Sequence, residues 1–551
     1  MDKKKLRIGL LIDAYTIPLW AYEMVKSIQN STHSEINLVV KNESASFTAS
    51  IESKPGNWNH LLFSLYQKWD KNHFKPTPDA FEPKNLKDII SCPEIMVRPK
   101  VLESKDIFEE QDVKTIDSHS IDVLIKLGFN DLGGALLQCA KYGVWGYHHG
   151  DFETHRGNAF GSLELLENWD ETRAVLLQLA ENIEDSTKIH EAYYSTDHVS
   201  MSRNRNVLYY NSATMLPRKL EELYRLGEKV FFGKIKKQAT EPLFYSNREF
   251  KTPTNIQVIK GLYHNWKRAI GGMISRKFYL RQWIILFQLE KSEKLSKSFH
   301  TFKRMMPPKT SFWADPFVIE KNGIYYIFIE EFVFSENKGK ISVIEMDQQG
   351  NYSEPTIVIE TPYHLSYPFL IEENGDLYMV PETEENRTIE LYKCIEFPLK
   401  WELQETLMDN IMAADTTIYK KDNKFWLFTN VKEYNGTKIA NELMLFYCDR
   451  LVGGKWTPHP QNPIAIDHHF ARPAGNIFNY GERVFRPAQN CSKHYGYGMQ
   501  IMEIMTLNET EYEERQIQSI YPNWEKDVKS VHTLNFSGRL TVIDATVIRR
   551  N

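Results

Sequence analysis

Ala314-Asp315-Pro-Phe-Val-Ile-Glu-Lys-Asn-Gly323-Ile-Tyr-Tyr-Ile-Phe-Ile-Glu330 is the stretch that best indicates the fold of this chain. Two runs rich in aromatic and β-branched residues flank an Asn-Gly pair, which is typical of a tight β-hairpin. The pattern returns at residues 367–382, 414–430, 472–490 and 532–544. A repeat roughly every 50–60 residues is typical of propeller blades. We therefore predict an all-β five-bladed propeller over residues 284–551.

The fourth and fifth copies match the first less closely. The fourth is looser, and the fifth is reduced to His532-Thr-Leu-Asn followed by Thr541-Val-Ile-Asp544-Ala. A ring of such units needs a strand that closes it, and Gln282-Trp-Ile-Ile-Leu-Phe-Gln-Leu289 is the candidate.

The first part of the chain has a different periodicity. Apolar runs typical of buried strands alternate with segments of helical spacing, and Pro18 stands where a helix would begin. The predicted strands are 6–14, 36–41, 121–128 and 144–148, and the predicted helices are 18–28 and Leu132–Tyr142. This alternation predicts a Rossmann-like α/β domain over residues 1–230, with a parallel sheet covered by helices on both faces.

A basic segment, residues 231–283, separates the two parts. It holds eleven lysines and arginines, among them Lys234, Lys236, Lys237, Lys251, Lys260, Lys267, Arg268, Arg276, Lys277 and Arg281, with few acids. One interpretation is a linker helix packed between domains with its basic face in water. The other is an amphipathic helix at 234–281 that contacts an anionic membrane surface or a phosphate-bearing substrate.

Composition limits the function classes. The net charge of −5 over 551 residues argues against general nucleic-acid binding. Five unclustered cysteines indicate neither a disulfide framework nor a cysteine zinc site. The apolar stretch from Leu6 to Asp13 is shorter than a secretory signal, and no stretch approaches the length of a membrane span. We expect a cytoplasmic protein, peripheral at the inner membrane face if the basic segment binds lipid.

A histidine motif stands out in the first part: Gly143-Val-Trp-Gly-Tyr-His148-His149-Gly-Asp-Phe-Glu-Thr-His-Arg156-Gly157. It resembles the active-site segment of folate-dependent formyltransferases, although the asparagine of that family, two residues before the histidine, is Gly146 here. The resemblance implies a formyltransferase-type domain that uses 10-formyltetrahydrofolate. His148 would be the base, oriented by Glu184 or Asp185, and His149, Arg156 and Asn158 would bind substrate.

Two other interpretations of this motif stay open. Loss of one oxyanion donor typically lowers the rate about 10²–10³-fold, so the fold could be kept as a binding domain only. A metal site is not expected, because the spacings of His148, His149 and His155 match no zinc pattern.

The repeats resemble two families. Ala-Asp-Pro-Phe-Val-Ile before an Asn-Gly turn is similar to the first blade of five-bladed arabinanase and fructosidase propellers. A closer resemblance, over residues 310–515, is to the N-terminal domain of plant glucosamine inositolphosphorylceramide transferases. It is carried by Phe312-Trp-Ala-Asp-Pro-Phe, Ser366-Tyr-Pro-Phe, Tyr378-Met-Val-Pro-Glu382, Phe397-Pro-Leu-Lys-Trp401 and Gly475-Asn. The resemblance implies a glycan context.

Residues at the start of each inner strand of a propeller point toward its central channel. This places Asp315, Asp415, Arg472 and His532 near the axis, with substrate-binding candidates close by: Glu330, Arg486 and Gln489. Glycosidases use two or three carboxylates, and here Asp315 would be the base, with Glu382 or Asp415 as acid or modulator.

We therefore expect a transferase that acts on sugars in cell-surface glycan biosynthesis, by formyl or glycosyl transfer. A glycosyl donor would be a nucleotide sugar, and the acceptor a sugar or lipid-linked glycan. Two alternatives remain: a propeller glycoside hydrolase that uses Asp315 with Glu382 or Asp415, and a non-catalytic glycan-binding scaffold.

Overall fold

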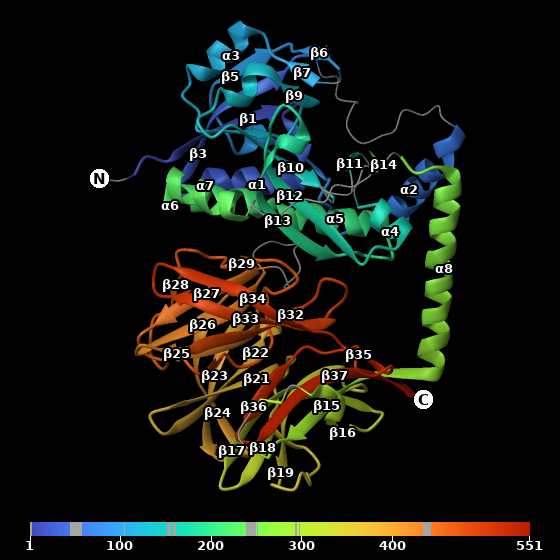
Figure 1. Cartoon of the computed structure of the whole chain (residues 1–551), viewed down its shortest axis with the longest axis vertical. Coiled ribbons are helices and arrows are strands. Elements are labelled where there is room, and N and C mark those ends of the chain that lie inside the picture. Colours follow the sequence, from blue (N-terminus) through green and yellow to red (C-terminus); the bar gives the residue numbers. More distant parts are fainter. Residues whose placement is uncertain are drawn as a thin grey trace. The chain divides into compact units, whose positions relative to one another are not determined.

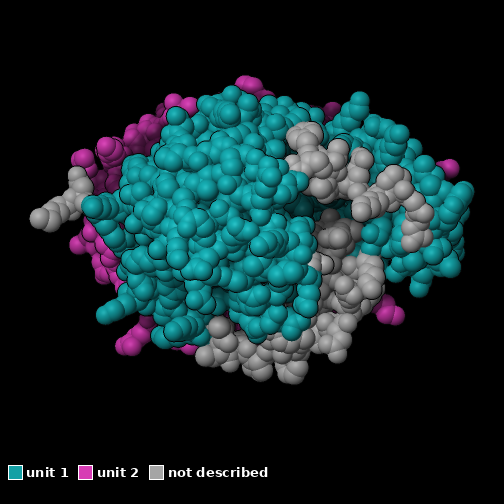
Figure 2. All heavy atoms as spheres, turned by 90° about the horizontal axis from the view of Figure 1, so that it is seen from above, with its two compact units in different colours: residues 1–266 teal, residues 267–551 magenta. Residues whose placement is uncertain are grey.

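The computed structural model describes residues 3–44, 58–103, 105–150, 156–157, 161–238, 249–250, 252–291, 295–296, 298–432 and 442–551. The chain divides into two compact units, residues 1–266 and 267–551 (Figure 2). The boundary lies within the helix α8 (Asn255–Phe278), inside the segment predicted as a basic linker. Among the described residues, no helix combines the length and apolarity that a membrane crossing requires.

Unit 1 is built on one seven-stranded sheet (Figure 1). Its order is β13 (Thr187–Ser195), β12 (Glu171–Gln178), β10 (Val144–His149), β8 (Val123–Lys126), β1 (Leu6–Ile12), β3 (Ser34–Asn42) and β5 (Glu94–Val97). The strands from β10 to β5 are parallel, which confirms the prediction for them. The prediction is wrong for β12 and β13, because both pair antiparallel at one edge.

Apolar side chains cover both faces of this sheet, as predicted. One core joins it to α1 (Leu19–Asn30), α6 (Met215–Leu226) and α7 (Glu228–Gln238), and the other to α3 (Glu110–Asp117) and η3 (Gly134–Gln138). The helix predicted at 132–142 does not form. The chain instead makes β9 (Asp131–Gly133) and the short 3-10 turn η3, because consecutive glycines, with Gly134 at φ +73°, disfavour an α-helix there.

The smaller elements of unit 1 complete the order. The helices are α2 (Leu61–His73), α4 (Leu163–Glu167) and α5 (Met201–Ala213), with 3-10 turns η1 (Trp58–His60), η2 (Leu86–Asp88) and η4 (Ile183–Asp185). The short strands are β2 (Thr16–Pro18), β4 (Pro83–Asn85), β6 (Lys100–Leu102), β7 (Lys105–Ile107), β11 (Arg156–Gly157) and β14 (Glu249–Phe250).

The described residues of unit 2 form five antiparallel sheets, four of them from consecutive strands. The first is β17 (Ser311–Lys321), β18 (Ile324–Val333), β19 (Lys338–Met346) and β20 (Thr356–Ile359). The second is β21 (Ser366–Glu373), β22 (Asp376–Thr383), β23 (Thr388–Glu396) and β24 (Lys400–Asp409), with η6 (Glu384–Asn386). The third is β25 (Ala413–Lys421), β26 (Lys424–Val431), β27 (Glu442–Cys448), β28 (Thr457–Pro458) and β29 (Ala465–Ile466). The fourth is β30 (Arg472–Pro473), β31 (Phe478–Tyr480), β32 (Arg483–Asn490), β33 (Gly498–Leu507) and β34 (Tyr512–Ile520).

The fifth sheet joins the two ends of unit 2. It contains β15 (Tyr279–Leu289), β16 (Lys303–Met305), β35 (Val528–Ser530), β36 (Leu534–Ser537) and β37 (Leu540–Arg550), with η5 (Phe299–Thr301) nearby. All of β15 pairs with β37, which confirms the predicted closing strand and begins it at Tyr279. Separate apolar clusters lie between successive sheets, and another packs the fifth sheet against the first. Each sheet therefore packs against the next, and the pairing of β15 with β37 joins the start of unit 2 to its end.

The carboxylate of Asp544 links the last strand of unit 2 to its first hairpin. Asp544 on β37 accepts hydrogen bonds from the backbone N–H groups of Asp315 (2.9 Å), His532 (3.1 Å) and Thr533 (2.9 Å). The Nδ1 atom of His532 lies 2.6 Å from its Oδ2. Asp544 is fully buried, so the last strand is joined to the first hairpin by contacts that exclude water.

The hairpin turns have the backbone that the sequence predicts. In the first three hairpins both turn residues have positive φ: Asn322 and Gly323, Asn374 and Gly375, and Asp422 and Asn423. Positive φ at both positions is the signature of a type I′ turn, whose twist matches that of the flanking strands.

Replacing Gly375 with alanine tests this turn. An added Cβ would meet nothing within 4 Å, so the expected loss of about 1 kcal/mol in unfolding free energy comes from the backbone at φ +84° alone. Gly271→Ala on α8 is the matched control, since Gly271 also has open space but is helical, and should not destabilise. Equal effects in urea unfolding would contradict the turn assignment.

Replacing Asp544 tests the closure. Asp544→Ala leaves three buried N–H groups without their acceptor, and we expect a loss of about 3–5 kcal/mol in unfolding free energy. Asp544→Asn keeps one carbonyl oxygen and should lose less. Thermal and urea unfolding of both variants measure the difference, and an alanine variant as stable as the parent would refute the role.

Candidate active site

The same irregularity occurs in the first strand of each of the first three hairpins. Two residues oppose one across the pair, at 315–316, 367–368 and 415–416. The first residue of each bulge is in the left-handed region: Asp315 at φ 49°, Tyr367 at φ 45° and Asp415 at φ 54°. A bulge redirects a side chain that regular pairing would place elsewhere.

The second strand of each hairpin supplies the partner position. Glu330, Glu382 and Asn430 pair across the strands with the residue that directly precedes each bulge. Glu330 and Asn430 are buried, and the Glu382 side chain is 12% exposed. Three successive sheets therefore contribute two polar side chains each, one from the bulge and one beside it.

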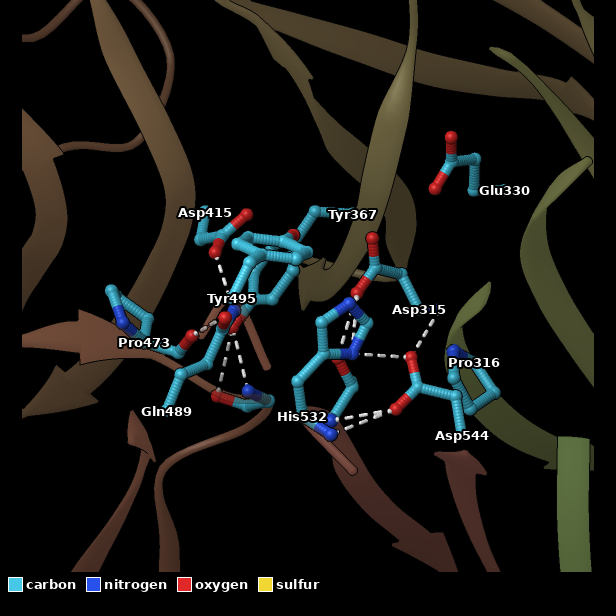
Figure 3. Close-up of polar contacts among 12 residues, drawn as sticks. Asp315, Pro316, Glu330, Tyr367, Asp415, Pro473, Gln489, Tyr495, His532 and Asp544 are labelled. Carbon is cyan, nitrogen blue, oxygen red and sulfur yellow. Dashed lines mark hydrogen bonds and ion pairs between the residues drawn. The ribbon is translucent and has the colours of Figure 1, made fainter. Parts of the chain in front are cut away.

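Asp415 is the anchor of one half of the resulting cluster. Its Oδ2 accepts hydrogen bonds from Arg472 Nε and, at 2.7 Å, from Gln489 Nε2. Arg472 also lies 3.6 Å from Glu382, whose Oε2 accepts the backbone N–H of Asp415 at 3.2 Å. Tyr495, 49% exposed, covers the guanidinium of Arg472 at 4.9 Å. Figure 3 shows Asp415, Gln489 and Tyr495 grouped on one side of the site.

Asp315 and His532 form the other half (Figure 3). Asp315 Oδ1 accepts a hydrogen bond from Thr533 Oγ1 at 2.7 Å. The His532 ring stacks on Trp283 at 4.1 Å and meets the edge of Tyr495 at 5.4 Å. Burial alone would lower the pKa of His532, but the carboxylates of Asp544 and Asp315 outweigh burial and raise it.

Burial sets the protonation of the carboxyl groups. It raises the pKa of Asp315 to about 6, although the nearby His532 opposes the shift. Burial, reinforced by neighbouring carboxylates, raises the pKa of Glu330 and Glu382 well above its usual range. The site therefore combines two glutamic acids that keep their protons to a higher pH than usual, and can then donate hydrogen bonds, with an aspartate that exchanges its proton near pH 6.

Asp315, His532 and Asp544 offer ligand atoms within 4.8 Å of one another and could together hold a cation. Both oxygens of Asp544 already accept hydrogen bonds from protein donors. These bonds account for the burial of Asp544 without a metal ion.

Most of the predicted channel residues meet in this cluster: Asp315, Glu330, Glu382, Asp415, Arg472, Gln489 and His532. Arg486 does not, which corrects its prediction as a substrate-binding residue. It is buried in an ion pair with Glu514 at 2.7 and 2.9 Å and donates to Phe470 O. Sequence reasoning missed Asp544, Thr533 and Tyr495, although Asp544 belongs to the fifth copy of the repeat.

Of the residues predicted in unit 1, the histidines and the two carboxylates lie at opposite ends of one strand pair. His148 and His149 end β10, where His148 pairs with Val175 of β12. Glu184 and Asp185 follow the far end of β12, where Leu179 N donates to Val144 O. Because β12 returns antiparallel, both carboxylates lie at the opposite end of this strand pair from His148. The predicted orientation of His148 by Glu184 or Asp185 is therefore corrected.

The contacts of His149 are those of a buried structural residue. His149 Nε2 lies 3.0 Å from Ser212 Oγ, its ring stacks on Tyr209 at 3.8 Å, and burial lowers its pKa to about 3. A Cβ on Gly146 would lie 3.3 Å from Leu179, so leucine occupies the space beside it. Asn158 and the side chain of Arg156 lie outside the described residues.

Comparison with known proteins places the similarity in unit 2. Residues 302–544 match the family described as glucosamine inositolphosphorylceramide transferase 1, N-terminal. A glucosamine inositolphosphorylceramide transferase 1 of Oryza sativa subsp. japonica is 31% identical over 208 residues, 37% of this chain and 28% of the relative. One of Arabidopsis thaliana is 30% identical over 211 residues, 38% of this chain and 27% of the relative. The chain thus covers less than a third of either relative.

Solved structures show weaker likenesses. An exo-1,5-α-L-arabinanase from a bovine ruminal metagenomic library has a TM-score of 0.31 and 17% identity, covering 44% of this chain and 94% of its own. A phosphoribosylglycinamide formyltransferase from Anaplasma phagocytophilum has a TM-score of 0.27 and 12% identity, covering 40% and 88%. The sequence match is more informative: its matched span includes every residue of the polar cluster from Asp315 to Asp544.

Proposed function

We propose that unit 2 is a five-bladed propeller and that its polar cluster is the active site of a glycosyltransferase. The observation that carries this proposal is the gathering of Asp315, Glu330, Glu382 and Asp415 from three successive hairpins into one buried cluster. Buried carboxyl groups are unfavourable unless they are paired or used, and perturbed pKa values concentrate at functional sites.

Sugar recognition suits these groups. Glu330 and Glu382, whose pKa values are raised, donate hydrogen bonds to hydroxyl oxygens when they are protonated, whereas ionised carboxylates accept them from hydroxyl groups. The exposed ring of Tyr495 offers an apolar face at the edge of the cluster. Arg472 holds the Asp415 carboxylate in place through its ion pair.

Asp315 is the proposed base. In the transfer, the acceptor hydroxyl gives its proton to Asp315 as its oxygen bonds to the anomeric carbon of a nucleotide sugar. The bond from that carbon to the diphosphate breaks, and the nucleoside diphosphate leaves with the electron pair. A pKa of about 6 leaves Asp315 ionised at neutral pH and more basic than an ordinary aspartate.

The acceptor that we propose is a lipid-linked glycan. Support comes from the plant relatives, whose name states transfer to inositolphosphorylceramide. The matched span contains the cluster but only part of those proteins, so the donor and acceptor are assigned here by proposal.

Hydrolysis is the second candidate, favoured by one observation. Asp315 and Glu382 lie in the same cluster, and glycoside cleavage requires one protonated and one ionised carboxyl group. Glu382, whose pKa is raised well above its usual range, would be the acid, and Asp315, with a pKa of about 6, the base. Formyl transfer is not part of the proposal, because His148 and the predicted carboxylates lie apart. A reduced folate near His148 and a cytoplasmic location stay predictions.

A transfer assay tests the proposal. The full chain is incubated with labelled nucleotide sugars and inositol phospholipid acceptors, and glycolipid products are identified by mass spectrometry. Asp315→Asn should lower turnover at least about 100-fold, because the base is lost. The exposed turn variant Asp422→Asn is the matched control and should keep full activity.

The same variants separate the alternatives. Release of free sugar from aryl glycosides without a donor, abolished by Asp315→Asn, would replace transfer with hydrolysis. Neither reaction across the whole panel of donors and acceptors would leave a binding site and overturn the enzymatic proposal.

The raised pKa of Asp315 also predicts a pH dependence of stability. A carboxyl group whose pKa is higher in the folded state stabilises folding below its unfolded value of 3.8, and this contribution is lost as pH rises through about 6. Asp315→Asn removes that loss. In urea unfolding, the variant should gain about 2–3 kcal/mol relative to the parent between pH 4 and pH 7. An unchanged difference would contradict the assigned pKa.

A further inference from the structure

A pocket of about 760 Å³ lies within unit 2, beside the C-terminal turn of α8. Its walls come from this turn, the start of β15, the turn before β33 and the segment around β35. The residues that matter here are Arg276, Arg281, His494, Tyr497, Tyr521 and Lys529. The sugar transfer proposed above uses none of these six residues.

The pocket is positively charged. Its lining contains two arginines and a lysine, and no aspartate or glutamate. Asp527 and Glu525 lie nearby but outside the lining, and both form ion pairs with Arg304. Arg276 is exposed on the last turn of α8 and lines the pocket, so its guanidinium is accessible to a ligand.

The other two cations keep donors to spare. Arg281 Nη2 donates to Ser530 Oγ at 2.9 Å, and Lys529 Nζ donates to Lys526 O at 2.6 Å. A guanidinium has five N–H donors and an ammonium has three, so each keeps donors for a ligand while one bond fixes its position. These three cationic side chains surround one opening and can therefore donate hydrogen bonds to the oxygens of a phosphate group.

Apolar and aromatic side chains border the same pocket. The ring centroids of Tyr497 and Tyr521 lie 5.5 Å apart, and Tyr279 is 47% exposed. On the last turns of α8, Met273, Ile274 and Phe278 are each more than half exposed. The ligand of such a site carries a phosphate together with an apolar or ring-bearing group.

We propose that this pocket binds an organic phosphate ester, with the phosphate held by Arg276, Arg281 and Lys529 and the organic group against the tyrosines. Two sources have this chemistry, the headgroup of a phospholipid and a soluble nucleotide. The exposed apolar residues of α8 suit the tails or headgroup region of a lipid, and the tyrosines suit either source.

A short turn joins this pocket to the polar cluster. His494 and Tyr497 line the pocket, and Tyr497 N donates to His494 O at 3.1 Å. Between them, Tyr495 covers Arg472 and meets the edge of His532. A phosphate ester in the pocket would therefore lie one turn of chain from the proposed sugar site.

Binding measurements on the full chain test the site. One arm measures cosedimentation with phosphatidylcholine vesicles, with and without phosphatidylinositol, and the other measures calorimetric binding of uridine diphosphate. Arg276→Glu and Lys529→Glu should each weaken binding about tenfold or more, since each replaces a phosphate contact with a repulsive charge. Arg276→Lys should keep part of the affinity.

Two controls isolate the pocket. Lys455→Glu reverses an exposed charge elsewhere in unit 2 and should bind like the parent. Asp422→Asn, in an exposed turn, should also bind normally. Both arms measure binding alone, so failure of the sugar-transfer proposal would not remove this result. Selective binding in the first arm identifies a lipid source, and saturable binding in the second a soluble one. No binding in either arm, or full binding by the Arg276→Glu, Lys529→Glu double variant, overturns the proposal.

Discussion

The buried carboxylate of Asp544 is the interaction on which the architecture of unit 2 depends. It lies on the last strand and accepts N–H groups from the first hairpin and from the segment before β36. The same oxygens hold the His532 imidazole, which in turn lies beside Asp315. Closure of the five sheets and alignment of the proposed base therefore arise from one set of hydrogen bonds. A change that loosens the closure also displaces the site.

The bulge of the repeat has the same backbone conformation in three sheets, but its first side chain differs. The bulge recurs in three sheets, but it presents aspartate in the first and third and tyrosine in the second. Tyr367 is fully buried, and its hydroxyl accepts Gly475 N at 2.6 Å and lies 2.8 Å from Thr417 Oγ1. It therefore fills the interior and ties the second sheet to the fourth. The other two bulges carry aspartate, so the acidic bulge residues lie in the first and third sheets.

Sequence reasoning succeeded where local rules decide the outcome. The turn residues fixed the hairpins and their register, and the register gathered Asp315, Glu382 and Asp415. It failed where a distant partner decides. The position of Arg486 in the repeat predicts a channel residue, but the side chain is instead buried in an ion pair with Glu514. Asp544 accepts hydrogen bonds from backbone N–H groups, which a pattern of side chains in the sequence does not reveal. In unit 1 the antiparallel return of β12, which the alternation of strands and helices does not predict, separated Glu184 from His148.

The left-handed backbone at Asp315, Tyr367 and Asp415 has a consequence for how this molecule would change under selection for heat resistance. A non-glycine residue in that region stores strain of about 1–3 kcal/mol, least for aspartate and most for a bulky side chain such as tyrosine. Glycine at these positions would relieve the strain and remove the side chains at the same time. Selection for thermal endurance alone would favour glycine at each of these positions, so persistence of Asp315 and Asp415 in a heat-stable form would itself be a mark of use.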